Sequence, residues 1–301
     1  MPAIVRSSDQ TSCSPYRTKN LRSIHAAGHD ESLRWCNLFD MATARTDKGQ
    51  RKVVPAAQRV LAVFEILLAS QKGLTVSEIA RGLGLARSSA FYIIHTIEEC
   101  GYIYHSSPRG RYTFTAKLLD LANRSLACMS VCRLAAPLLR QLMQKTGLTV
   151  HLGVLSQNEV VLIHKAAPRD GQQMATWVGK RMPIHCTGLG KALMAFLPSA
   201  QIDFRIKQGL LRYNENTIVS ARKLKEELLK MRERGFALDD EEETVGLRCI
   251  GVPLFDANNQ AVAAISVAGT LTQLADEKLD SLAHEVKRTA ASISEQLRER
   301  D

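Results

Sequence analysis

Between residues 75 and 111 the chain carries side chains of the kinds that bind DNA. Arginine pairs with phosphate or guanine, serine and tyrosine hydroxyls bond phosphates or bases, and an aromatic ring can meet a thymine methyl group. We expect a DNA-binding surface made by Thr75, Arg87, Ser88, Ser89, Phe91, Tyr92, Arg109 and Arg111. The plainer interpretation is that some of these side chains are only exposed to solvent.

Three helices and a hairpin are predicted to position these side chains. Apolar residues at helical spacing predict a first helix that ends by Gly73. The capping box Thr75-Val-Ser-Glu78 opens a second helix over 76–83, and a third follows from about 86 to 100, stopped by Gly101. Strands at 102–105 and 111–115 flank a Pro-Arg-Gly turn. This order predicts a winged helix-turn-helix over 53–115. In such domains the first residues of the third helix contact base edges in the major groove of DNA.

The charge distribution agrees with a nucleic-acid partner. The 301 residues include 40 Lys and Arg against 30 Asp and Glu, a net charge of +10. Residues 51–130 hold 10 basic and 5 acidic side chains, whereas residues 131–301 hold 23 and 20. The basic excess is therefore densest in a block the size of one DNA-binding module.

The remaining sequence predicts a tail, a linker and a second domain. Residues 1–52 lack sustained periodicity and are predicted to be a mobile polar tail. A helical stretch over 116–146 should be interrupted at Pro137, with 116–132 as a connecting helix. Strands at 149–155, 159–164, 249–255 and 261–268 and helices at 188–196, 220–234 and 276–298 follow. This mixture predicts an α+β domain over 133–301 with a mainly antiparallel sheet flanked by helices.

Several segments of the chain match a known family. They are residues 74–80 (LTVSEIA), 84–89 (GLARSS), 98–102 (EECGY), 146–152 (TGLTVHL), 183–192 (PIHCTGLGKA), 235–242 (GFALDDEE) and 248–256 (RCIGVPLFD). On these motifs, which lie within residues 53–300, the chain resembles the IclR family of bacterial transcriptional regulators. The resemblance implies a GAF-like C-terminal domain that binds a small metabolite, commonly an organic or aromatic acid.

The resemblance also implies the residues that hold this effector. Carried over onto this sequence, they are Thr187, Gly188, Leu189, Asp239, Cys249 and Ser266. The physical chemistry agrees, because free amides at the start of a helix at Gly188 suit a carboxylate. Two positions depart from the family pattern: Ala268 stands where a second serine is common in members that bind keto acids, and Tyr92 where a basic residue is frequent. The pocket is therefore expected to be less polar than in the members that bind keto acids, and the operator need not match a generic family site.

Two other classes of function are weighed against this one. An enzyme or metal site could use His151, His164, His185, Cys186 and the acidic run 239–243, but none has an established metal-ligand spacing. We therefore expect no catalytic residue, metal or cofactor. The other alternative is a small-molecule-sensing interaction module whose winged helix binds protein instead of DNA. Salt dependence separates the two, since phosphate contacts make DNA binding steeply salt-dependent.

The expected partners follow from this interpretation. One winged helix reads too few base pairs for specificity, so we expect a homodimer or homotetramer on palindromic double-stranded DNA. The apolar stripe of the connecting helix is the expected dimerising element, with packing inside one chain as its alternative; it comprises Leu118, Leu119, Leu121, Ala122, Leu126 and Met129. Seven cysteines without a CxxC pair, no secretory signal and no long apolar run indicate the cytoplasm and no membrane. Control of catabolic genes is the expected role.

Overall fold

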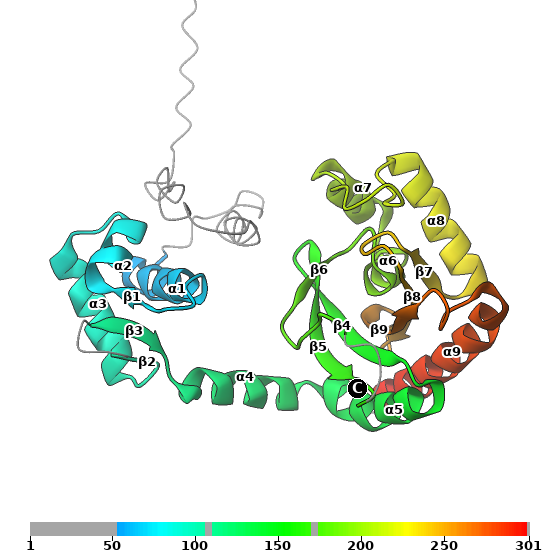
Figure 1. Cartoon of the computed structure of the whole chain (residues 1–301), viewed down its shortest axis with the longest axis horizontal. Coiled ribbons are helices and arrows are strands. Elements are labelled where there is room, and N and C mark those ends of the chain that lie inside the picture. The colour runs from blue at the N-terminus through cyan, green and yellow to red at the C-terminus, as the bar shows by residue number, and fades with distance from the viewer. Residues whose placement is uncertain (1–52, 106–109, 170–173, 300–301) are drawn as a thin grey trace, which may run out of the picture. The chain divides into compact units, whose positions relative to one another are not determined.

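The computed structural model describes residues 53–105, 110–169 and 174–299 (Figure 1). The predicted mobile tail, residues 1–52, lies outside this range. The chain divides into two compact units, one up to Asn123 and the other from Arg124 onward. The division falls inside helix α4 (Ala116–Cys128).

The first unit is a three-helix domain with a small antiparallel sheet. Its helices are α1 (Pro55–Leu68), α2 (Val76–Leu83) and α3 (Arg87–Glu99), and its strands are β1 (Leu74–Thr75), β2 (Ile103–His105) and β3 (Arg111–Phe114). The strand order is β1-β3-β2. The predicted winged helix-turn-helix is confirmed in every helix and in the hairpin strands. Strand β1 was not predicted, because two residues are too few to show an alternating pattern.

Local sequence sets the turn between α2 and α3. The Thr75 hydroxyl accepts a hydrogen bond from the Glu78 amide, and the Glu78 carboxylate accepts one from the Thr75 amide, so the predicted capping box is present. Gly84 ends α2 with a φ of +64°, a left-handed conformation that glycine adopts without steric cost. These two signals define where α2 begins and ends.

The break after α4 differs from the prediction. Helix α4 ends at Cys128 and α5 (Ser130–Thr146) begins after an 84° bend, while Pro137 lies inside α5. Pro137 is exposed, and α5 continues through it although proline removes one backbone hydrogen bond and its ring crowds the carbonyl group four residues earlier. The bend is instead set by packing, because Leu126, Met129 and Cys132 lie against the core of the second unit. The interruption predicted at Pro137 is therefore wrong.

The second unit is built on a six-stranded antiparallel sheet of order β6-β5-β4-β9-β8-β7. The strands are β4 (Thr149–Ser156), β5 (Glu159–Ala166), β6 (Arg181–Pro183), β7 (Ala237–Asp240), β8 (Leu247–Phe255) and β9 (Ala261–Thr270). The helices are α5, α6 (Gly188–Met194), α7 (Ser199–Lys207), α8 (Ala221–Arg234) and α9 (Asp276–Arg298). The α+β class with a mainly antiparallel, helix-flanked sheet is confirmed; β6, β7 and α7 were not predicted.

The two faces of this sheet carry separate apolar cores. Helices α5 and α9 lie beside each other on one face (Figure 1), where Leu139 and Ile293 pack on alternate residues of β4, β8 and β9. Helices α6, α7 and α8 pack on the other face around Leu162 and Leu193. Because successive side chains of a strand point to opposite faces, a sheet covered on both sides reads as nearly continuous apolar sequence. Among the described residues no single helix is long and apolar enough to cross a membrane.

Candidate functional site

Helix α3 separates an apolar face from an exposed polar one. Ala90, Ile94 and Ile97 are buried in the core of the first unit, as their spacing predicts. The side chains predicted to meet DNA are exposed on the opposite face: Arg87, Ser88, Ser89, Phe91 and Tyr92. Phe91 and Tyr92, on the first two turns of α3, are exposed and do not pack in the core, so both rings can contact a bound macromolecule.

A recess of about 240 Å³ joins the start of α3 to the start of α2 and the hairpin. The residues that line it are Thr75, Val76, Ser77, Arg87, Phe91, His105, Gly110 and Tyr112. Three predicted residues, Thr75, Arg87 and Phe91, are thus brought together. The prediction omitted Ser77 and His105. Ser77 could have been found, because it follows the capping residue at an exposed helix start.

Two predicted DNA contacts have partners within the protein. The Arg111 guanidinium donates to the Gly73 carbonyl oxygen at 2.9 Å and to the Glu78 carboxylate at 3.2 Å. The Thr75 hydroxyl is used in the capping box. Arg111 therefore ties strand β3 to the start of α2, and Thr75 stabilises the start of α2; neither role was expected. Arg109 lies outside the described residues.

In the second unit, the residues implied for the effector lie on the α6 face of the sheet. Cys249 is the register partner of Asp239 on β7 and of Ala268 on β9, and Gly251 is the partner of Ser266. Paired residues on neighbouring strands point to the same face. Asp239, Cys249 and Ser266 therefore form one polar group beneath the start of α6.

The first turn of α6 lies directly on strand β8. A Cβ atom added to Gly251 would lie 2.1 Å from the Gly188 carbonyl oxygen, and one added to Gly190 would lie 2.3 Å from that of Ile184. Thr187 caps the helix: its hydroxyl accepts from the Gly190 amide at 3.1 Å and donates to the Pro183 carbonyl oxygen at 2.7 Å. The glycines are thus required by close backbone approach, which places helical amides beside Cys249.

Burial controls the chemistry of the acidic and thiol groups here. Asp239 is 3% exposed, and burial raises the pKa of its carboxyl to about 7, with Lys191 opposing the rise and Glu242 adding to it. The Asp239 carboxylate oxygen accepts a hydrogen bond from the Glu242 amide at 3.0 Å. Burial and the neighbouring Asp239 raise the pKa of the Cys249 thiol. Near neutral pH the group is therefore poised between a neutral and an ionised carboxyl.

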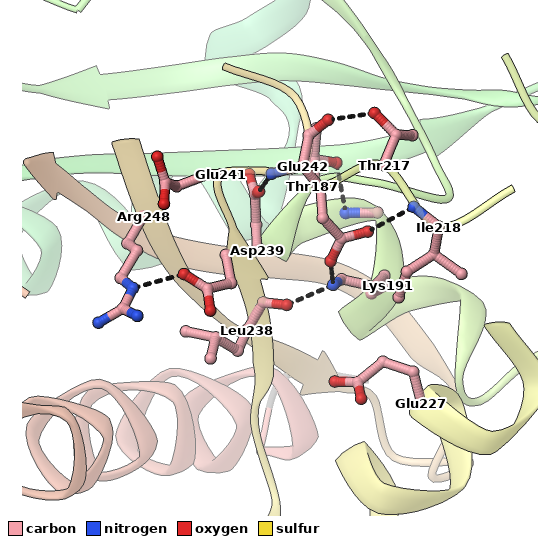
Figure 2. A network of polar contacts seen from close by, with 12 residues as sticks. Thr187, Lys191, Thr217, Ile218, Glu227, Leu238, Asp239, Glu241, Glu242 and Arg248 are labelled. Carbon is pink, nitrogen blue, oxygen red and sulfur yellow. Dashed lines mark hydrogen bonds and ion pairs between the residues drawn. The ribbon is translucent and has the colours of Figure 1, made fainter. Parts of the chain in front are cut away.

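A buried ion pair that was not predicted ties this group to α6 (Figure 2). The Lys191 ammonium, 1% exposed, donates to the Glu242 carboxylate and to the Leu238 carbonyl oxygen. The Thr217 hydroxyl donates to the Glu242 carbonyl oxygen at 2.7 Å, and the Ile218 amide to its carboxylate at 3.4 Å. A lysine in an apolar helix is usually a solvated residue, so spacing gives no sign of such burial.

Polar side chains also continue the row beyond Ser266. His151 is the register partner of Ser266, and Lys165 is the partner of His151. The His151 Nε2 lies 2.8 Å from the Thr176 hydroxyl, and the Lys165 ammonium donates to the carbonyl oxygens of Met174 and Thr176. Burial, with Lys165 and Lys180 nearby, lowers the pKa of His151 to about 3, so its ring is neutral. These groups hold residues 174–176 beside the site.

Two other features of the second unit do not coincide with the implied site. A cavity of about 390 Å³ lies beyond β7, lined by Asn216, Ile218, Glu227, Arg234, Leu238, Asp240, Glu241 and Glu242. None of the six implied effector residues lines it. Within the described part of the chain, no group of three or more His, Cys, Asp or Glu side chains is arranged to hold a metal ion.

The chain matches two family models that together span most of its length. Residues 56–107 match the IclR helix-turn-helix domain, and residues 123–295 match the C-terminal domain of the bacterial transcriptional regulator IclR. The HTH-type transcriptional regulator KdgR of Escherichia coli is 31% identical over 85% of this chain and 97% of its own. The HTH-type transcriptional repressor AllR of Klebsiella pneumoniae is 31% identical over 81% and 90%.

Solved structures show the same fold. The crystal structure of the Thermotoga maritima IclR is 30% identical, covers 80% of this chain and 98% of its own, and has a TM-score of 0.67. An IclR homolog from Microbacterium hydrocarbonoxydans, complexed with 4-hydroxybenzoate, is 22% identical, covers 81% and 99%, and has a TM-score of 0.71. The relatives are regulators of transcription and not enzymes. The chain therefore belongs to the IclR family of DNA-binding transcriptional regulators with a C-terminal effector-binding domain.

Proposed function

We propose that the exposed start of α3 and the recess beside it form the DNA-binding surface. The observation that carries this is the continuous group of Arg87, Phe91 and Tyr92 at the start of a helix whose opposite face is buried. Ser77 and His105, which line the same recess, are added to the predicted contacts. Arg109 remains a proposed contact of the wing. Arg111 and Thr75 remain proposed contacts, and they also act as internal supports of strand β3 and of the start of α2.

We propose that the second unit binds a small organic or aromatic acid between α6 and strands β7, β8 and β9. The residues are Thr187, Gly188, Leu189, Asp239, Cys249 and Ser266. The Gly190 amide is bonded to the Thr187 hydroxyl, so the Gly188 and Leu189 amides and the helix dipole are what would favour an anion at the start of α6. The 4-hydroxybenzoate held by a relative of the same fold makes hydroxybenzoic acids the first ligands to test.

We propose further that the chain acts as a homodimer or homotetramer on a palindromic operator in the cytoplasm, and controls catabolic genes. Leu119 and Leu121 on α4 are 63% and 52% exposed, and α4 has no buried residue. Such an apolar stripe on a helix suits a second copy of the same helix. A dimer provides two recognition helices, so it recognises both the sequence of each half-site and the spacing between the two half-sites.

A thermal-shift assay followed by a DNA-binding titration tests both acid binding and its effect on DNA affinity. A panel of pyruvate, benzoate and 4-hydroxybenzoate is added to the purified chain, because a ligand that binds the folded state raises its Tm. The acid that raises Tm is then added to a DNA-binding titration, where a change in DNA affinity is expected. If an acid raises Tm and leaves DNA affinity unaltered at every salt concentration, the proposed coupling is wrong.

A further inference from the structure

The buried pair of Lys191 and Glu242 joins the two halves of the proposed effector site. Lys191 lies one turn along α6 from Gly188, so its backbone belongs to the helix whose amides would meet a carboxylate. Glu242 follows β7, and its own amide holds the Asp239 carboxylate. The pair therefore connects the helix start to the acidic group on the other side of the site (Figure 2).

The surroundings of the pair hold it in one arrangement. Lys191 also donates to the Leu238 carbonyl oxygen on β7, and Glu242 also accepts from the Ile218 amide. Asn214 donates from its side-chain amide to the carbonyl oxygens of Glu241 and Glu242 at 2.9 and 3.2 Å. Each charged atom has a partner inside the protein, so the pair is fixed in a way that exposed ion pairs are not.

Stability alone does not account for such a pair. Replacing a buried ion pair by apolar side chains of similar volume is often neutral or stabilising, because both charges must be removed from water. We propose that Lys191 and Glu242 are positioning residues of the effector site: they fix Asp239 relative to the first turn of α6, so that a carboxylate ligand meets both. This inference rests on the proposed effector site.

The pair also influences the proton on Asp239. The charged and titratable groups that face Asp239 are Lys191 on α6, Glu242 and Glu243 after β7, Cys249 on β8 and Cys186 before α6. Because Glu242 neutralises Lys191, burial dominates and the pKa of Asp239 rises to about 7. A neutral Asp239 can donate a hydrogen bond to a carboxylate, whereas an ionised one repels it.

The test compares Glu242→Gln with the wild-type full-length chain by calorimetric titration of benzoate and 4-hydroxybenzoate. The substitution leaves the Lys191 ammonium facing Asp239, which lowers the Asp239 pKa. We expect about tenfold weaker binding near pH 7, as for other residues that orient a contacting group, and a smaller loss near pH 6. Asp240→Asn, one residue along β7 and on its other face, is the matched control and should bind as the wild type does.

A second variant separates positioning from folding. Lys191→Met combined with Glu242→Leu removes both charges, so its Tm should stay near that of the wild type while its affinity for these acids stays about tenfold lower. Wild-type affinity in this folded double variant, or a Glu242→Gln variant that loses affinity equally at every pH, would overturn the inference. If the wild-type chain itself binds neither acid nor any other of the panel, the proposed effector site is what fails.

Discussion

The close contact between α6 and β8 makes Gly251→Ala a severe change for so small a substitution. The new methyl group would lie 2.1 Å from the Gly188 carbonyl oxygen and 3.0 Å from the Leu189 amide nitrogen. Both neighbours are backbone atoms, so the whole first turn of α6 must move by about 1 Å to relieve the overlap. Overpacking of this kind costs about 3 kcal/mol, which lowers the Tm of a domain this size by roughly 6–12 °C.

Thermal denaturation and acid titration measure the two consequences together. We expect the lower Tm and at least a tenfold loss of acid affinity, which corresponds to about 1.4 kcal/mol. Gly82→Ala is the matched control: its methyl group meets only the Ile66 side chain, whose terminal Cδ1 atom is nearest at 3.1 Å, and alanine favours a helix, so stability should stay within about 1 kcal/mol. A Gly251→Ala chain with wild-type Tm and affinity would refute the packing of α6 on β8 described above.

Three further results are expected. Arg87→Ala should weaken DNA binding at all sequences and reduce the slope of log affinity against log salt by about one, measured by fluorescence anisotropy; Arg222→Ala, on α8, should leave the slope unchanged. Leu119→Asp should shift the chain toward monomers in light scattering, because it places a charge on the exposed stripe of α4; an unchanged mass would assign the contact elsewhere. Asp239→Asn should remove one component of the pH dependence of unfolding. In the folded state the pKa of Asp239 is raised from 3.8 to about 7, so the Asp239 carboxyl contributes stability that is fully present below pH 4 and is lost as the pH rises through 7. Denaturant titrations at several pH values with no difference between variant and wild type would contradict the neutral state of Asp239.

The sequence predicts those parts of the fold that local interactions determine. Thr75 with Glu78 and Gly84 define the turn before α3, because their signals depend only on neighbours in the chain. The bend at Met129 was missed because it depends on packing of Leu126 and Met129 against a sheet formed by distant residues. Pro137 gave the opposite signal, since proline restricts the helix locally but can be accommodated on an exposed face.

The site divides in the same way. Resemblance to the family indicated Asp239, Cys249 and Ser266, and strand pairing brings their side chains to one face. The ion pair of Lys191 was out of reach, because nothing near Lys191 in the sequence indicates that Glu242, 51 positions away, is its partner. Arg111 was predicted from its charge, yet its bonds to Gly73 and Glu78 depend on how β3 meets α2.

One titration tests most directly whether acid binding in the second unit controls DNA binding by the first. DNA affinity is measured by anisotropy on a fragment from upstream of the gene for this chain, across a range of salt, with and without the acid that raises Tm. A steep salt dependence and an acid-induced change in affinity, absent in Gly251→Ala, are predicted. DNA affinity that is independent of salt, or identical with and without a bound acid, would contradict the account.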